Sequence, residues 1–243
     1  MTHLTGMVGV VTGASSGIGE GLAKMLAAEG VKVALAARRE AELERVAAEI
    51  RSSGGAAFGV PTNMREEDQL RNLIERTEQE LGPIDLLVNN AGVARNQPIH
   101  RLNMKHWDLV MAVNLRAPAY LCSAVLPGMR ERQRGFIVNI ASEAGMFVET
   151  GMGAYTVSKH ALRVLTQLVQ DENQEHGIKA WAICPGMVDT PMGAEMPGGD
   201  PVRYLKVDDV VKVVHFLLTQ GDNVKMGPEI LIRTMLNPFE HEQ

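Results

Sequence analysis

The sequence predicts an α/β fold with a doubly wound parallel β-sheet, and three observations support this prediction. Short β-branched or aliphatic runs alternate with longer amphipathic stretches along nearly all of the chain. The runs are apolar almost throughout, as expected of strands that helices cover on both faces. A glycine-rich turn lies between the first run and the first amphipathic stretch. Because strand–helix–strand units form right-handed crossovers, the strands should be parallel.

Seven of the runs are expected to be strands and six of the stretches to be helices. No linker, repeat or low-complexity tract interrupts them, so residues 1–243 should form a single domain. Residues 185–206, rich in Gly, Pro and Met, break the regular order, and we expect 187–206 to be a lid over a site, with a plain surface loop as the alternative. The expected strands are residues 7–12, 31–36, 56–60, 84–88, 136–140, 178–183 and 230–232, and the expected helices are 17–29, 40–53, 66–81, 103–132, 154–176 and 208–218.

The composition is that of an ordinary folded protein, with 45% hydrophobic and 22% charged residues. The net charge is -5, from 24 Lys+Arg and 29 Asp+Glu, and no basic run suggests a nucleic-acid partner. Cys122 and Cys184 lie in apolar surroundings, which indicates core residues rather than a disulfide or a metal site. The N-terminus lacks a signal-peptide pattern, and no apolar run approaches the ~20 residues of a membrane span. A cytoplasmic protein without a metal ion or a membrane partner is expected.

The glycine-rich turn has the sequence Thr12-Gly-Ala-Ser-Ser-Gly-Ile-Gly19. Gly13 can make a sharp turn, Gly17 can let backbone amides approach a ligand, and Gly19 can let the helix pack closely on the sheet. The helix N-terminus then offers free N–H groups and a positive dipole end to a pyrophosphate. The turn therefore predicts a dinucleotide site, with three residues after the first glycine where the standard fingerprint has one. The expected contacts are Gly13, Ser15, Ser16, Gly17, Ile18 and Gly19.

Two arginines follow the second expected strand and favour one nicotinamide cofactor over the other. A carboxylate at this point would hold a free ribose diol, whereas a cation accepts a 2′-phosphate. The strand ends in Ala36-Ala37-Arg38-Arg39, and guanidinium groups suit phosphate geometry. NADP(H) is therefore the expected cofactor, with Arg38 as the preferred phosphate ligand and Ser15 assisting. The alternative is that Arg38 and Arg39 only cover the surface of the next helix.

Tyr155 and Lys159 are four residues apart, which places them on one face of a helix. A tyrosine has a reference pKa of about 10, and a neighbouring positive charge is expected to lower it. The pair can then act as a general acid and base, while Ser142 holds a carbonyl oxygen beside it. The alternative is a packed tyrosine beside a surface lysine.

Together these motifs resemble the short-chain dehydrogenases/reductases over essentially the whole chain. The resemblance implies a single Rossmann-type domain with seven parallel strands and a nicotinamide cofactor across the strand ends. It also implies that Tyr155 is the acid/base, that Lys159 holds the nicotinamide ribose, and that Ser142 orients the substrate carbonyl. Asn114 would sustain a water-linked proton relay. The motifs are Thr12-Gly13-x3-Gly17-x-Gly19, Asn89-Asn90-Ala91-Gly92, Asn114, Ser142, Tyr155-x3-Lys159 and Pro185-Gly186, in the family's order.

The resemblance adds cofactor contacts beyond the glycine turn and also shows departures from the family pattern. Asn63 stands where the family usually has an aspartate that touches the adenine, and its amide can still bond there. Glu143 stands where we would expect a small residue; it faces solvent or, alternatively, steers a charged or hydroxylated substrate. The further contacts implied are Asn90, Ala91, Gly92, Pro185, Gly186, Val188 and Thr190.

The resulting hypothesis is an NADP(H)-dependent oxidoreductase that interconverts a carbonyl and a secondary alcohol, of the 3-oxoacyl or 3-hydroxy acid type or a broader ketone. A non-catalytic NADP-binding regulator on the same fold is the alternative. The long helices suggest a homotetramer or homodimer. Arg95 and Arg203 are candidates for binding a substrate carboxylate. Apolar residues expected at the mouth, as pocket or as ordinary packing, are Met146, Phe147, Met152, Met187, Met192 and Met196.

Overall fold

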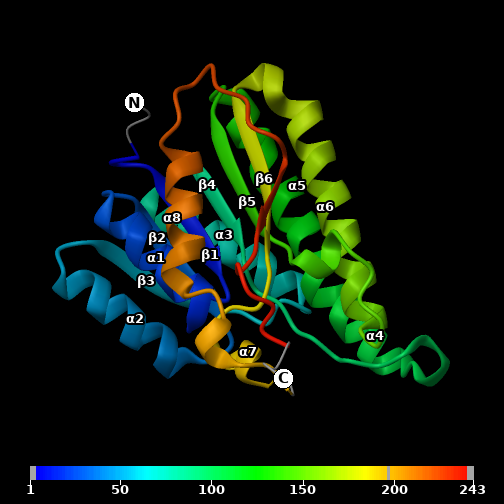
Figure 1. Ribbon diagram of the computed structural model, residues 1–243. Coiled ribbons are helices and arrows are strands. Elements are labelled where there is room, and N and C mark those ends of the chain that lie inside the picture. Colours follow the sequence, from blue (N-terminus) through cyan, green and yellow to red (C-terminus); the bar gives the residue numbers. More distant parts are fainter. Residues whose placement is uncertain (1–3, 196–197, 240–243) are drawn as a thin grey trace.

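The computed structural model describes residues 4–195 and 198–239, which form a seven-stranded sheet with helices on both faces (Figure 1). All neighbouring strands pair in parallel, in the order β3-β2-β1-β4-β5-β6-β7. The predicted fold class is therefore confirmed. The strands are β1 (Val8–Thr12), β2 (Lys32–Ala37), β3 (Ala56–Pro61), β4 (Leu86–Asn89), β5 (Gly135–Ile140), β6 (Ile178–Pro185) and β7 (Glu229–Ile232).

Two helical layers cover the sheet. Helices α1, α2 and α8 pack on one face and α3, α5 and α6 on the other, each layer with its own apolar core (Figure 1). Side chains along β1 point alternately into the two cores. Val11 belongs to the core under α1, α2 and α8, and Val10 belongs to the core under α3, α5 and α6. The helices are α1 (Gly17–Ala28), α2 (Glu40–Ser52), α3 (Glu67–Leu81), α4 (Met104–Met111), α5 (Ala117–Glu131), α6 (Gly153–Asn173), α7 (Pro191–Ala194) and α8 (Val207–Leu218).

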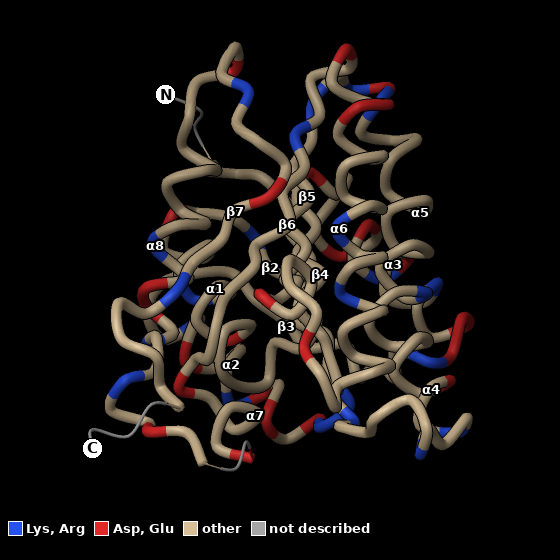
Figure 2. Tube along the Cα trace, turned by 45° about the vertical axis from the view of Figure 1, so that its right-hand side comes forward, with Lys and Arg blue, Asp and Glu red and all other residues tan. Residues whose placement is uncertain are grey.

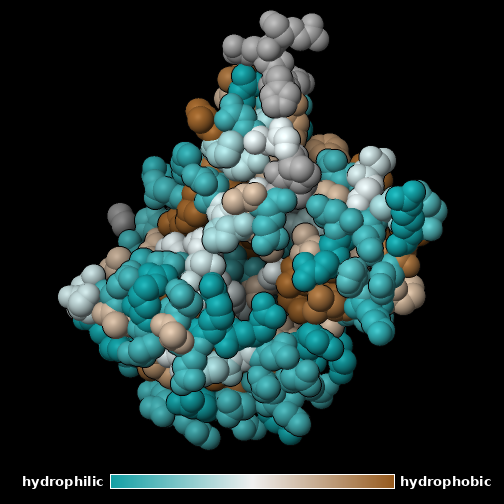
Figure 3. All heavy atoms as spheres, turned by 90° about the horizontal axis from the view of Figure 1, so that it is seen from below, coloured by the Kyte–Doolittle hydropathy of each residue, from teal (hydrophilic) through white to brown (hydrophobic). Residues whose placement is uncertain are grey.

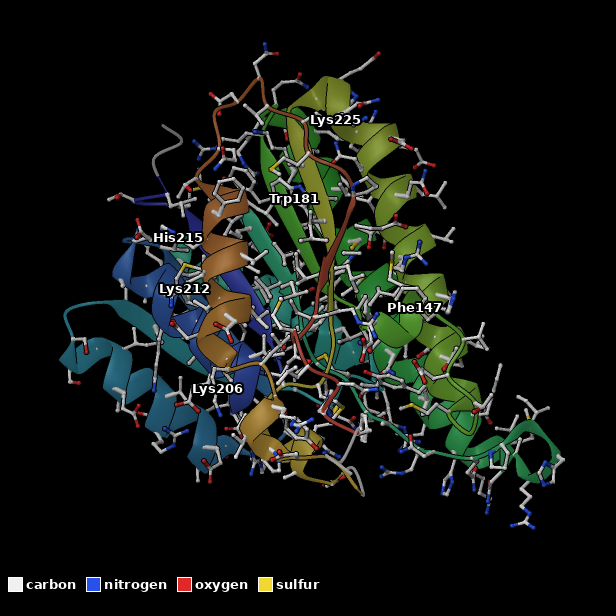
Figure 4. The ribbon with its side chains drawn as sticks, in the orientation of Figure 1. Phe147, Trp181, Lys206, Lys212, His215 and Lys225 are labelled. Carbon is white, nitrogen blue, oxygen red and sulfur yellow. The ribbon has the colours of Figure 1, made fainter. Side chains whose placement is uncertain are left out.

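Large side chains fill the space between the sheet and these helices. Trp181 on β6 is 1% exposed, and its ring stacks on Phe136 of β5 with centroids 6.3 Å apart (Figure 4). Cys122 and Cys184 are buried and unpaired, which agrees with the sequence interpretation. Among the described residues, no group of His, Cys, Asp and Glu could hold a metal ion.

The helix expected over residues 103–132 is not a uniform α-helix. Between α4 and α5 the residues Ala112–Arg116 form a π-helical turn, which includes Asn114. A π-turn shifts the residues after it around the helix axis, and such turns are often found at functional sites. Sequence periodicity did not predict it, because one extra residue in a long apolar stretch leaves the pattern almost unchanged.

The same stretch corrects another expectation. Among the described residues, Met104–Glu131 is long and apolar enough to cross a membrane by length and composition alone. Within its most apolar window, 44% of residues are buried inside the protein. Leu121, Val125 and Met129 of α5 belong to the core beneath the sheet, so the apolar face of this helix is used by internal packing.

The described residues of this segment, 185–195 and 198–206, are more ordered than the sequence suggested. Thr190 caps the short helix α7, and a single β-bridge joins Val188 to Leu205. This segment lies at the carboxyl ends of the strands, beside the beginning of α8 (Figure 1). Figure 3 looks onto that end of the molecule, where the surface is recessed near its middle. In parallel α/β folds this edge of the sheet is where ligands bind.

Candidate functional site

The glycine turn between β1 and α1 has no space for a side chain at Gly13 or Gly19. Gly13 has a φ of +65°, and a Cβ there would lie 2.7 Å from the Nδ2 of Asn90. A Cβ on Gly19 would overlap both Asn90 and the carbonyl of Gly13. Gly19 is therefore needed for the close fit of the turn itself, a role different from the helix–sheet packing that we expected.

Asn90 and Thr12 hold this turn against the end of β4. The Asn90 amide donates to the carbonyls of Thr12, at 2.9 Å, and Gly13, at 3.2 Å. In return, the Thr12 hydroxyl accepts from the backbone N–H groups of Asn90 and Ala91, both at 3.0 Å. Asn90 thus shapes the cradle that a pyrophosphate would enter.

The arginines after β2 lie at the rim of the glycine turn. Arg39 donates to the hydroxyl of Ser15 at 3.3 Å. Arg38 is exposed, and within residues 4–195 and 198–239 it has no hydrogen-bond or ion-pair partner. Asn63, at the end of β3, uses its carbonyl oxygen to accept from the N–H of Arg65 at 3.2 Å, so its side chain is partly committed to its own turn.

Tyr155 and Lys159 project from the first turns of α6 toward Ser142, which follows β5. The hydroxyl of Ser142 interacts with the Tyr155 phenol and also accepts from the N–H of Ala144 at 3.1 Å. Lys159 is 3% exposed, and its Nζ donates to the carbonyl of Ile140 at 2.7 Å. That Nζ lies 5.7 Å from the centre of the Tyr155 ring. Both side chains therefore lie on one helix face, as the spacing predicted.

The electrostatics of this pair differ from the sequence expectation. Burial raises the pKa of the Tyr155 phenol; the hydrogen bond from Ser142 opposes this shift and the charge of Glu143 adds to it. The net lowering of this pKa that the sequence predicted is therefore wrong for the protein chain by itself, because desolvation of the phenolate outweighs the effects that lower the pKa. Burial also lowers the pKa of Lys159 to about 8, since the ammonium is removed from water.

Asn114 lies in the π-turn and is fully buried. Its amide oxygen accepts from the N–H of Val93, and its amide nitrogen donates to the Val93 carbonyl, both at 2.9 Å. The amide nitrogen also donates to the hydroxyl of Ser158 at 3.1 Å. A Cβ on Gly92 would lie 3.7 Å from both the Asn114 oxygen and the Lys159 Nζ. Asn114 and Lys159 thus face the same small volume above Gly92.

The segment after β6 closes the opposite side of the edge. Thr190 lies against the glycine turn, because a Cβ on Gly17 would be 3.1 Å from its methyl group. The Thr190 hydroxyl accepts from the N–H of Gly193 at 3.1 Å, and Val188 is buried. Pro185 ends β6, and the N–H of Gly186 donates to the carbonyl of Ile232 at 2.8 Å. The predicted cofactor residues from β1, β4 and β6 are therefore brought to one edge.

The structure bears on three expectations about the mouth and corrects the first. Glu143 does not face solvent freely: its side chain is 22% exposed and pairs with Arg233 at 3.0 Å. Arg95 is exposed and donates to its neighbour Ala94, while Arg203 pairs with Asp200 at 3.5 Å. Of the apolar mouth residues, Met146 packs on a buried cluster, whereas Phe147 and Met192 are 46% and 41% exposed. Met196 lies outside the described residues.

Sequence reasoning missed Arg163, one turn after Lys159 on α6. Its guanidinium donates to the carbonyl of Gly145 at 2.5 Å and twice to the carboxylate of Glu229, at 2.6 and 3.1 Å. It thus ties the loop after Ser142 to β7. The only available signal was an arginine at helical spacing from Lys159, which is too common to interpret without the tertiary structure.

Comparison with known proteins agrees with this geometry. The family described as short chain dehydrogenase matches residues 7–199. The chain belongs to this family. An uncharacterised oxidoreductase of Staphylococcus aureus is 36% identical over 233 residues, which are 96% of this chain and 99% of the relative. A similar protein of Staphylococcus saprophyticus is 35% identical over 234 residues, with the same coverage.

Solved short-chain dehydrogenase structures have the same fold over nearly the whole chain. An alcohol dehydrogenase from Thermococcus sibiricus, complexed with 5-hydroxy-NADP, is 27% identical with a TM-score of 0.87, covering 98% of this chain and 99% of that one. A variant of actinorhodin polyketide ketoreductase with NADPH is 31% identical with a TM-score of 0.88, covering 94% and 96%. A metagenomic short-chain oxidoreductase in complex with NADP is 34% identical with a TM-score of 0.84, covering 97% and 100%.

Proposed function

We propose that this short-chain dehydrogenase interconverts a carbonyl and a secondary alcohol with NADP(H), through Ser142, Tyr155 and Lys159. The main support is that the Ser142 hydroxyl and the Tyr155 phenol meet beside the buried Lys159, on the same edge of the sheet as the glycine turn. A non-catalytic regulator has no chemical need for this arrangement.

The chain's own residues fit the cofactor. The space that a Cβ would fill on Gly13 and Gly19 is taken up by Asn90 and the turn itself, so only backbone faces a pyrophosphate. Arg38, free of partners among the described residues, and Ser15 with Arg39 offer donors to a 2′-phosphate. Bound cofactors seen in the relatives' structures, NADP or NADPH, support this choice. The cofactor supplies the hydride that adds to the carbonyl carbon.

Tyr155 provides the proton that balances this hydride. The raised pKa keeps the phenol protonated, as a donor to the carbonyl oxygen requires, and Ser142 gives that oxygen a second hydrogen bond. The product is an alcohol and a tyrosinate, which the nearby Lys159 ammonium stabilises. Asn114, facing the same volume as Lys159, would hold a water molecule that passes a proton from solvent back to Tyr155 by way of the lysine.

The remaining expectations are part of the proposal. Residues 1–243 would act as one cytoplasmic domain, with 187–206 as its lid, Asn63 and the Asn90–Gly92 run on the adenosine side, and Val188 and Thr190 near the nicotinamide. The ketoreductase and alcohol dehydrogenase relatives support 3-oxoacyl, 3-hydroxy acid or simple ketone substrates. Exposed apolar residues on α6 support a homotetramer or homodimer: Val157, Val164 and Leu168.

The experiment is a substrate screen with both nicotinamide cofactors. Oxidation of NADPH is followed by its absorbance in the presence of simple ketones, hydroxyketones and 3-oxoacyl esters. We expect turnover with NADPH to exceed that with NADH. Tight NADPH binding without turnover of any carbonyl or alcohol would support the regulator instead.

A further inference from the structure

The residue directly after Ser142 places a carboxylate beside the proposed catalytic group, where its charge acts on Tyr155. The loop Ser142–Gly145 forms a single 3-10 turn that Ser142 caps, and Glu143 is its first residue. The Glu143 carboxylate lies over Gly186, so closely that a Cβ on Gly186 would be 3.2 Å from its Oε1. It therefore bridges the space between the catalytic serine loop and the segment that follows β6.

Arg233 holds this carboxylate from the outside, and its guanidinium lies over the ring of Phe147. The Nε of Arg233 donates to Glu143 at 3.0 Å, and the guanidinium carbon lies 5.4 Å from the centre of the Phe147 ring. Arg233 is 58% exposed at its side chain, whereas Glu143 is 22% exposed. Figure 4 shows Phe147 beside α6, the helix that carries Tyr155 in its first turn. In this ion pair Glu143 therefore lies toward the interior and Arg233 toward solvent.

Packing does not explain why an acid occupies this position. Burial raises the pKa of Glu143 more than Arg233 lowers it, and the charge of Glu149 raises it further. A half-buried carboxylate whose single ion pair does not offset its desolvation is unfavourable for folding. Carboxylates in such surroundings are concentrated at functional sites, where a ligand supplies the missing donor.

We propose that Glu143 binds a hydrogen-bond donor on the substrate, a hydroxyl or an ammonium group on the carbon next to the reacting carbonyl. The Glu143 carboxylate lies near enough to Tyr155 for its charge to raise the pKa of the phenol, so a substrate whose carbonyl oxygen lies between Ser142 and Tyr155 has a neighbouring substituent within reach of Glu143. This inference rests on the proposed function, and it selects hydroxylated or aminated ketones from the broader substrate classes.

The charges disfavour a substrate carboxylate at the same point. Glu143 and Glu149 carry two negative charges, against the one positive charge of Arg233. A third carboxylate would be repelled by Glu143, while Arg233 is already engaged. A neutral or cationic donor meets no such repulsion.

Matched substrate pairs test this proposal. NADPH-dependent reduction of acetoin is compared with that of butan-2-one, which lacks only the hydroxyl. Aminoacetone then tests whether an ammonium group is accepted, and pyruvate tests whether a carboxylate is disfavoured. We expect wild-type protein to have a higher kcat/KM for the donor-bearing ketones. In Glu143→Gln, the ratio of kcat/KM for acetoin to that for butan-2-one should fall about tenfold, the loss typical of a hydrogen bond to a charged group.

Glu149→Gln is the matched control, because it removes an exposed neighbouring carboxylate that lies outside the serine loop. Its substrate ratio should remain that of the wild type. If Glu143→Gln lowers kcat/KM for every ketone by the same factor, Glu143 only supports the loop and the proposal is wrong. Equal turnover of acetoin and butan-2-one by wild-type protein also overturns it, but leaves the proposed function intact. Failure to reduce any carbonyl would refute the proposed function itself.

Discussion

The glycine turn after β1 and the serine loop after β5 lie on the same edge of the sheet but are held in place differently. Backbone and amide contacts from Thr12 and Asn90 fix the glycine turn, and Arg39 adds a hydrogen bond to Ser15 only at its rim. Ion pairs from distant elements fix the serine loop: Arg163 with Glu229, and Glu143 with Arg233. The cofactor side therefore depends on shape, while the substrate side depends on charged side chains that can change without altering the fold.

The ion pairs on the surface also differ between the cofactor side and the predicted lid. Helices α1 and α2 are joined by a network of largely exposed pairs in which Arg45 contacts Glu20, Glu42 and Glu49. Figure 2 shows acidic and basic residues along both helices. Such exposed pairs contribute little individually. Near the lid, Lys206 at the start of α8 pairs with Asp189 at 3.0 Å (Figure 4). The network joins helices behind the cofactor side, whereas the Lys206 pair spans the segment that we propose as a lid.

The largest expected effect on turnover comes from Tyr155, which lies between the cofactor side and the substrate side. Tyr155→Phe removes the proton donor, so turnover should fall by about a thousandfold, within the usual range for general acid catalysis. NADPH affinity should be nearly unchanged, because the ring remains. Steady-state kinetics and fluorescence titration of NADPH measure the two quantities, with Tyr120→Phe as control. Substantial residual turnover would remove Tyr155 from its role.

A smaller effect is expected from the cofactor side. Gly19→Ala forces a methyl group onto Asn90 and the Gly13 carbonyl, so the cradle must distort. Overpacking of this kind costs about 1–3 kcal/mol, and we expect NADPH affinity to weaken by up to about 100-fold. Gly227→Ala is the control, since nothing lies within 4 Å of its added Cβ. Unchanged affinity in Gly19→Ala would show that the cofactor side does not depend on shape.

The rim of the cofactor side should respond through charge. Arg38→Asp removes a phosphate donor and adds a repelling carboxylate, so the ratio of kcat/KM for NADPH to that for NADH should fall by about 30-fold. Arg39→Asp also disturbs Ser15 and serves as the comparison. If only Arg39→Asp changes the ratio, the 2′-phosphate assignment moves to Arg39; if neither does, it is wrong.

The smallest expected effect is on the substrate side. Arg163→Gln loosens the tie between the serine loop and β7, and kcat should fall by about tenfold, as for a lost charge-assisted hydrogen bond. NADPH affinity should not change, because the cradle is untouched. Arg163→Lys should recover part of kcat, and Arg71→Gln, which alters an exposed pair, should behave as wild type. An equal loss of NADPH affinity would indicate general destabilisation.

The elements that the sequence predicted well are those with strong local signals. The seven strands were found because each is apolar on both faces, and the boundaries differ by one or two residues at most ends. The glycine turn and the Tyr155–Lys159 spacing also depend on neighbouring residues alone. The π-turn at Asn114 and helix α7 were missed, because each deviates from regular periodicity over only a few residues.

By itself, the sequence determined the parallel sheet, the family, and which residues gather at the carboxyl ends of the strands. Periodicity and short motifs are local properties, and parallel α/β topology then brings their ends together. Only the tertiary structure decided the environment of each group: that burial raises the pKa of Tyr155, that Glu143 lies inward against Gly186, and that Arg163 and Arg233 reach the serine loop. Desolvation and ion pairing depend on residues far apart in the chain, such as Glu143 and Arg233, and spacing in the sequence carries no information about them.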